Sequence, residues 1–150
     1  MTNRRVDTDG PVTSITSPTS GTRVSGNVTL TAAAADPAGV TRVDFQVLLF
    51  GVWTTYCFDT SASYTCSGNS TGVADGSYQV RVVATDTLGH TTASAPITLI
   101  IDNTGPNATA VDSAANGATD GRIDAGDTIT FTWSEPMAPA SIMTGWNGGS

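Results

Sequence analysis

Lysine is absent from this chain of 150 residues, and glutamate occurs once, at Glu135. The remaining acidic charge comes from aspartate, and only six arginines oppose it, so the formal net charge is −7. Such a chain lacks the basic patch that nucleic acid requires, and anionic membranes repel it. The composition therefore predicts no nucleic-acid partner and makes divalent cations the more natural ligands.

Strong helix formers and long apolar runs are also scarce. Threonine, serine, alanine, glycine and valine dominate, which favours strands and turns. No segment approaches the ~20 apolar residues that a membrane-spanning helix needs. The charged first residues lead into no apolar run of a signal peptide. We therefore expect no membrane insertion, and we expect any export signal to lie outside this sequence.

Apolar and polar residues alternate in short segments separated by turn-forming residues, a pattern typical of half-buried strands. About seven such segments within 11–102 predict an all-β fold, a two-sheet antiparallel β-sandwich. Tyr78 is expected to form a tyrosine corner or to be an ordinary half-buried core residue. The predicted strands span residues 12–16, 27–34, 41–49, 53–58, 63–67, 78–85 and 92–101. The predicted inner rows are Val28/Leu30, Val43/Phe45/Val47 and Tyr78/Val80/Val82.

A short linker sequence occurs twice, as Asp7-Thr8-Asp9-Gly10-Pro11 and as Asp102-Asn103-Thr104-Gly105-Pro106. Its return after the length of one sandwich predicts a tandem array of domains. We assign residues 1–10 to a tail or linker, 11–102 to the sandwich, 103–107 to a linker and 108–150 to a truncated second β unit. Strands predicted at 108–112 and 128–134 are too few to bury Phe131 and Trp133.

Cys57 and Cys66 are the two cysteines of the chain. Their spacing lacks the paired Cys or Cys/His pattern of a zinc site. They are expected to form a disulfide that ties two neighbouring strands together, the alternative being two free buried thiols. A disulfide favours an oxidising compartment.

Several segments carry a resemblance to a known family. Residues 11–102 resemble a bacterial immunoglobulin-like (Ig-like) repeat of secreted and cell-surface proteins, chiefly at Val12–Pro18, Ala35–Phe45, Ala74–Tyr78 and Ala84–Thr91. The tail is similar to the opening of another such repeat at Ile123–Phe131 and Trp133–Met137. The resemblance implies an Ig-like sandwich, an extracellular or cell-surface location and neighbouring Ig-like domains as partners. The Lys–Asn isopeptide bonds of some such domains are impossible without lysine.

Two groups of oxygen-bearing side chains are candidate calcium ligands. Asn116, Asp120, Asp124 and Asp127 fall within a twelve-residue, Asp/Gly-rich segment that can be aligned with a calcium loop. No helices are expected around it, so an ordinary turn between strands is the alternative.

The second group is the linker residue Asp102 with Asn103, which resembles the acidic junctions of cadherin-type arrays, where calcium stiffens the joint. Asp7, Asp9, Asp36 and Asp86 are candidate contributors. The alternative is a solvated hinge whose proline limits its flexibility.

Trp53 and Tyr56 are candidate carbohydrate-binding residues, because exposed aromatic rings on a sandwich can stack on sugars. The alternative is that they belong to the core and the sheet edge. His90 is expected to be a solvated turn residue, and no catalytic pair of side chains is recognisable, so no enzyme is predicted.

The sequence favours a non-catalytic, extracellular structural or adhesive module, such as a spacer or stalk repeat, without a cofactor unless calcium binds. One alternative is a carbohydrate-binding accessory module of an exported hydrolase, and the other is a calcium-stiffened array joint. Carbohydrate or a cell-surface protein is a further candidate partner.

Overall fold

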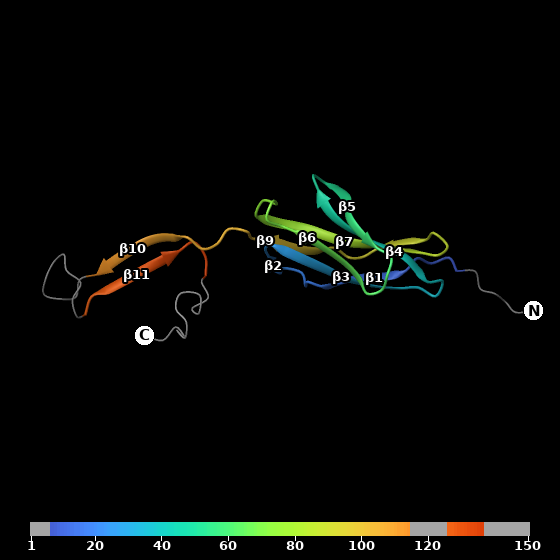
Figure 1. Ribbon diagram of the computed structural model, residues 1–150, viewed down its shortest axis with the longest axis horizontal. Helices are drawn as coiled ribbons and strands as arrows, with labels where there is room; N and C mark the ends of the chain where they lie inside the picture. The colour runs from blue at the N-terminus through green and yellow to red at the C-terminus, as the bar shows by residue number, and fades with distance from the viewer. Residues whose placement is uncertain (1–6, 115–125, 137–150) are drawn as a thin grey trace, which may run out of the picture. The chain divides into compact units, whose positions relative to one another are not determined.

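The computed structural model of the chain describes residues 7–114 and 126–136 (Figure 1). It divides into two compact units, Met1–Asn103 and Thr104–Ser150, which we describe separately. Every regular element within the described ranges is a β-strand, which confirms the predicted all-β class. None of the described residues forms a helix with the length and apolar character to cross a membrane.

Two sheets face each other in the first unit. The smaller sheet has the order β1-β3-β6, and the larger has the order β2-β9-β7-β4-β5, with β8 also paired to β7. The strands of the smaller sheet are β1 (Val12–Ser17), β3 (Asn27–Ala35) and β6 (Tyr64–Asn69). Those of the larger sheet are β2 (Arg23–Val24), β4 (Val40–Leu49), β5 (Val52–Asp59), β7 (Gly76–Asp86), β8 (Thr91–Ala93) and β9 (Ile97–Ile101).

The core lies between these sheets and is densest at β4 and β7. Val43, Val82 and Ala84 have no exposed surface, and Phe45 has 1%. Because Val43 lies opposite Ala84 and Phe45 lies opposite Val82 in the register, the period-two pattern of each strand places its apolar residues on one face. The smaller sheet contributes Ala32, Tyr64 and Cys66 to the same core.

The last predicted strand, 92–101, is divided in the structure. β8 pairs with the second half of β7 and β9 with the first half, and Ser94, Ala95 and Pro96 lie between them. Proline offers no N–H to a ladder, so the pairing is interrupted there. Ser94 compensates with its side chain, because its Oγ accepts the Val82 N–H at 3.1 Å while its own N–H donates to the Val82 carbonyl at 2.8 Å.

β2, which the sequence pattern does not predict, has two residues that pair parallel to Ile100 and Ile101 of β9. Two residues carry no detectable periodicity, and the pairing partner lies more than seventy residues away in the sequence. The sandwich is therefore antiparallel except at this one short parallel pair.

The disulfide between Cys57 and Cys66 is present, with its Cα atoms 6.3 Å apart. Cys57 belongs to β5 of the larger sheet and Cys66 to β6 of the smaller sheet. The bond therefore joins the two layers at one margin, where the chain passes from one sheet to the other.

The second unit contains β10 (Ala108–Ala114) and β11 (Thr128–Trp133), an antiparallel pair. Val111 lies opposite Phe131, and these side chains are 60% and 57% exposed. One apolar face of this pair is thus uncovered within the described residues, as expected for two strands without a second layer.

β4 and β5 are joined by the two-residue turn Phe50-Gly51, and Figure 1 shows this hairpin projecting from the sandwich. Both turn residues have positive φ, 51° and 82°, which is the requirement of a type I′ turn. Phe50 is fully exposed, so packing of its ring does not offset the free-energy cost of its left-handed backbone conformation.

Replacing Phe50 by asparagine, which tolerates this conformation, should raise the free energy of unfolding by ~0.5–1 kcal/mol. Urea unfolding followed by tryptophan fluorescence measures the change. Phe50→Ala is the matched control: it removes the ring but keeps a Cβ that disfavours positive φ, so its stability should stay near that of the parent. Equal stabilisation by both substitutions would show that the ring, and not the backbone, is responsible.

Removing the disulfide by Cys57→Ser with Cys66→Ser should lower the free energy of unfolding by ~2–3 kcal/mol, because the unfolded chain regains the freedom of a closed loop of about ten residues. Thermal unfolding with and without reductant measures it. The parent should lose stability on reduction, while the double variant should be indifferent to reductant. A parent unaffected by full reduction would contradict a stabilising role for the bond.

Candidate functional site

Three aspartates from distant parts of the sequence meet at one end of the sandwich. Asp7 belongs to the incoming linker, Asp36 follows β3, and Asp86 ends β7. One carboxylate oxygen from each lies within 4.8 Å of the others. The strand register causes this meeting, because Val12 pairs with Ala35 and Val40 pairs with Asp86. We call these three residues the acidic cluster.

Local turns orient each carboxylate. Oδ1 of Asp36 accepts the Ala38 N–H at 2.7 Å, and Oδ1 of Asp86 accepts the N–H groups of Leu88 and His90, each at 2.8 Å. Oδ1 of Asp7 accepts the Asp9 N–H at 3.2 Å. These contacts are Asx turns, in which a short side chain takes the place of backbone and fixes its own rotamer. The cluster is thus held by the backbone of three separate loops.

The second carboxylate oxygens differ in their surroundings. Oδ2 of Asp86 lies 2.8 Å from Nδ1 of His90, and the Asp86 side chain is fully buried. Oδ2 of Asp7 is buried as well, yet it has no hydrogen-bond partner. A buried carboxylate oxygen without a partner is costly, because its hydration is lost and nothing replaces it.

The incoming linker is fitted closely to the sandwich at this end. Pro11 is among the fully buried side chains. A Cβ placed on Gly10 would lie 3.0 Å from the carbonyl carbon of Thr91 and still closer to the Thr92 hydroxyl. Only glycine therefore permits this approach of the linker to β8, and Asp7 is brought to the cluster by a positioned segment.

Electrostatics couple His90 to the cluster. Burial raises the pKa of the Asp86 carboxyl, but the hydrogen bonds from His90 and Leu88 outweigh it and hold this pKa below its usual range. The hydrogen bond to Asp86, against some desolvation, raises the pKa of His90 above 6.5, and Asp7 and Asp36 add to the rise. The stabilisation from protonated His90 is therefore complete below pH 6.5 and is lost as pH rises through the raised pKa.

His90, predicted from the sequence to be a solvated turn residue, is only partly solvated in the structure. Its side chain is 37% exposed and bonded to Asp86 four residues earlier. The spacing of an aspartate and a histidine across a four-residue turn was the available signal. It has little specificity without the knowledge that Asp86 is buried.

The other linker leaves from the opposite end of the sandwich. Ile101, at the end of β9, pairs with Gly76 at the start of β7, whereas Asp86 is at the end of β7. Asp102 forms an ion pair with Arg23 at 2.7 Å. Of the residues predicted for an acidic joint, the structure therefore brings together Asp7, Asp36 and Asp86 but not Asp102.

Asn103 fastens the start of this outgoing linker. Its Nδ2 donates to the carbonyls of Ser70 and Val73 at 2.8 and 2.9 Å, and its Oδ1 accepts the Ser70 hydroxyl at 3.1 Å. Its N–H donates to Asp75 Oδ1 at 2.6 Å. The loop between β6 and β7 is thereby bound to the linker.

The predicted calcium loop remains a prediction. Asn116, Asp120 and Asp124 lie outside the described residues. Asp127 is described and half-buried, just before β11.

The two candidate sugar-binding rings point to opposite sides of β5. Trp53 faces the outer surface of the larger sheet, where the Arg81 guanidinium lies 4.3 Å from its ring centroid. Tyr56 is the extra residue of a β-bulge and lies on the inner side, beside Gly68 of β6. The rings share no face, so they form no common stacking platform.

Phe58, which the sequence reading did not select, is the second outer-face ring of β5. The Arg42 guanidinium lies 3.8 Å from its centroid and is also bonded to both carboxylate oxygens of Asp44. An arginine guanidinium thus contacts each of the two outer aromatic rings, an arrangement that stabilises the sheet face through cation–π contact.

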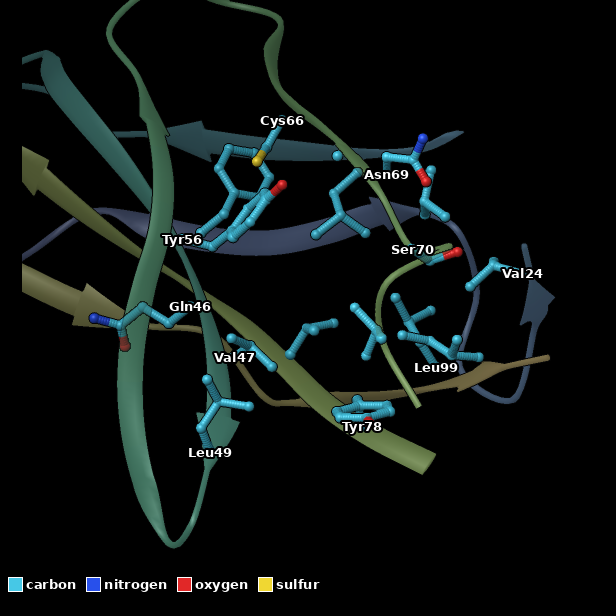
Figure 2. Close-up of a pocket in the computed structure, with 17 residues that line it drawn as sticks. Val24, Gln46, Val47, Leu49, Tyr56, Cys66, Asn69, Ser70, Tyr78 and Leu99 are labelled. Atoms are coloured by element: carbon cyan, nitrogen blue, oxygen red, sulfur yellow. The ribbon is translucent and has the colours of Figure 1, made fainter. Parts of the chain in front are cut away.

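An apolar cavity of about 340 Å³ opens between the sheets at the end that bears the outgoing linker (Figure 2). Figure 2 shows Val24, Val47, Leu49, Tyr78 and Leu99 around it. The Tyr78 hydroxyl donates to the Ala74 carbonyl at 2.9 Å, so of the two alternatives given for this residue the structure has the tyrosine corner. The lining offers few polar groups that could orient a ligand.

Comparison with known proteins agrees with this architecture. Residues 11–82 match the family described as bacterial Ig domain. None of the curated proteins matches the chain.

Among solved structures, the fibronectin(III)-like modules of Clostridium thermocellum CbhA are 26% identical with a TM-score of 0.51, over 60% of this chain and 94% of that one. The endo-β-1,4-mannanase of Thermotoga petrophila is 15% identical with a TM-score of 0.49, over 69% of this chain and 22% of the mannanase. Dimeric latent PorU of Porphyromonas gingivalis is 20% identical with a TM-score of 0.48, over 63% of this chain and 10% of PorU.

The chain therefore has a bacterial Ig domain at residues 11–82, which lie within the β-sandwich described above. This confirms the family resemblance noted in the sequence. The sandwich is similar to the fibronectin(III)-like modules of CbhA.

Substituting Asn103 by alanine should lower the free energy of unfolding by ~2 kcal/mol, because three side-chain hydrogen bonds, two of them part-buried, are lost. Chemical denaturation measures the loss. Asn103→Asp keeps the acceptor oxygen and removes the two donated hydrogen bonds. At neutral pH its free energy of unfolding should therefore lie between those of Asn103→Ala and the parent. If Asn103→Ala were as stable as the parent, the linker would not be fastened by this side chain.

Proposed function

We propose that this bacterial Ig domain is a non-catalytic spacer module of an exported, multidomain protein, with neighbouring Ig-like domains as its partners. The observation that carries the proposal is the fixed attachment of both copies of the repeated linker. The incoming copy is held through Pro11 and the close approach of Gly10, and the outgoing copy is held through Asn103. A module with both linkers positioned fixes the direction of the chain at each end.

The geometry of the ends suits a chain that transmits load. The linkers enter and leave at opposite ends of β7, which at ~3.4 Å per residue is roughly 35 Å long. β2 and β9 run parallel, so tension on the two termini shears their hydrogen bonds together instead of opening them in sequence. Shared loading of several bonds resists extension better than sequential opening.

The disulfide supports an extracellular location, because such bonds persist mainly in oxidising compartments. Binding of carbohydrate by an accessory module has less support, since Trp53 and Tyr56 lie on opposite faces and arginine covers Trp53.

Force spectroscopy of the full chain tests the spacer function. Pulling through the two termini should unfold the sandwich in one event, with a contour gain on the order of 25 nm at ~3.6 Å per residue. The intact disulfide prevents the segment between Cys57 and Cys66, a sequence separation of 9, from extending. Reduction of the disulfide should therefore increase the contour-length gain by the length of this segment.

The control is pulling between residue 50 and the carboxyl terminus, which loads the sandwich from one end only, because Val47 pairs with Val80 near the start of β7. The unfolding force measured through the two termini should be several-fold higher than the unfolding force measured between residue 50 and the carboxyl terminus. Equal or lower force through the termini would argue against a load-bearing spacer.

A further inference from the structure

We propose that two copies of this chain pair through the β4–β5 hairpin, with the Phe50 ring of each copy inserted into the apolar cavity of the other. The turn of the hairpin is the projection, the cavity is the recess, and both lie on one surface of the sandwich. The pairing depends on these two features and goes beyond the spacer function proposed above.

The projection is the turn between β4 and β5. Phe50 is fully exposed and has a φ of 51°, a backbone conformation that glycine and asparagine adopt more readily. Within one copy of the chain, no packing of the ring offsets this conformation. Strained backbone of this kind is concentrated at ligand-binding and other functional sites. The ring is therefore placed as the anchor of an intermolecular contact.

The recess is the cavity of about 340 Å³ between the sheets. It has room for a phenyl ring, because an apolar cavity of ~150 Å³ is enough to bind benzene. Figure 2 shows Val47 and Leu49 on one side of it and Val24 and Leu99 on the other. Since few polar groups are present to orient a polar ligand, the cavity favours an apolar occupant.

The inner face of the hairpin is uncovered beside the cavity. Leu49 lines the cavity and pairs with Val52 next to the turn, and these side chains are 37% and 64% exposed. Tyr56 also lines the cavity and is 62% exposed. Because Phe50 follows Leu49 directly, the projection and the recess are neighbours. A surface that holds both can meet its own copy about a two-fold axis, with each ring entering the recess of the other copy.

The exposed apolar area reaches what a weak, specific pair requires. Full exposure gives an aromatic side chain ~200 Å² and an aliphatic one ~100 Å² of apolar surface. Scaled by their exposed fractions, Leu49, Phe50, Val52, Tyr56 and Val73 present roughly 500 Å². Two copies would bury roughly 1,000 Å², the lower bound for a biological interface. We therefore expect a reversible dimer with a Kd on the order of 100 µM.

Charge also selects this surface for contact between two copies. Each chain has a formal net charge of −7, so two copies repel one another at long range. Residues 45–58 include no charged side chain, and the described residues that line the cavity include none either. The pairing is therefore driven by apolar burial and opposed by repulsion from elsewhere on the chains. Raising NaCl from ~0.05 to ~0.5 M should lower Kd several-fold.

Sedimentation equilibrium of the full chain, from ~10 µM to ~1 mM, measures the pairing. Phe50→Asn should raise Kd at least ~10-fold, because it removes the anchor ring. The fold is not at risk, since this substitution suits the turn and should stabilise the dilute, monomeric chain.

Leu88→Asn is the matched control. Leu88 is also an exposed apolar turn residue, but it follows β7 at the opposite end of the sandwich, so its substitution should change Kd by less than about twofold. Association that persists in Phe50→Asn but is lost in Phe131→Asn would place the contact on the second unit and overturn the proposal.

A mixing experiment tests reciprocal insertion. Val28→Phe fills the cavity from β3 and should raise Kd at least ~10-fold. When Val28→Phe is mixed with Phe50→Asn, chains that keep the ring meet chains that keep the cavity, so one ring can still insert. The mixture should therefore associate about threefold or more tightly than either variant alone. Absence of any gain on mixing would overturn reciprocal insertion.

Methyl NMR of the parent tests the same contact without a cavity variant. The ring current of an inserted Phe50 should shift the methyl signals of Leu30 and Leu99 as concentration rises, and Phe50→Asn should abolish these shifts. Dimerisation without such shifts would place the contact elsewhere and overturn the proposal.

A parent chain that stays monomeric to ~1 mM would also overturn the pairing. Binding of an apolar dye by that monomer would then assign the cavity to a small apolar ligand. Resistance of the same chain to terminal load would keep the spacer function and remove only the dimer.

Discussion

The pairing of β4 with β7 is the contact on which the rest of the structure depends. It places Val43 opposite Ala84 and Phe45 opposite Val82, which together form the driest part of the core. The smaller sheet adds the buried pair Ala32 and Tyr64, together with Cys66, to the same core. Beyond an irregularity between Val40 and Arg42, the same pair of strands ends with Val40 opposite Asp86, so the ladder leads from the core to the acidic cluster.

A buried aspartate at the end of a core strand is unusual unless something compensates its charge. Here Asp86 receives two backbone N–H groups and His90, and this network shapes the turn between β7 and β8. The linker residue Asp7 then brings a further carboxylate to a place that is already negative. The sandwich thus ends in a surface built to receive a linker and to hold negative charge beside it.

The outer surface of the larger sheet follows a different principle. Trp53 contacts the Arg81 guanidinium and Phe58 contacts the Arg42 guanidinium, so each ring on this face has a cation–π partner. This explains how an edge strand rich in aromatic residues can remain at a sheet margin. It also separates Trp53 from Tyr56, which the bulge turns toward the inner side.

The strands, their inner faces, the disulfide and the recurring linker followed from the sequence, because periodicity and spacing are local properties of a chain. β2, the division of 92–101 and the opposite facing of Trp53 and Tyr56 did not, because each depends on a partner strand that is distant in sequence. The meeting of Asp7, Asp36 and Asp86 is of the same kind: the sequence offered them as candidates together with Asp9 and Asp102. Strand register alone selected which carboxylates share an end of the sandwich.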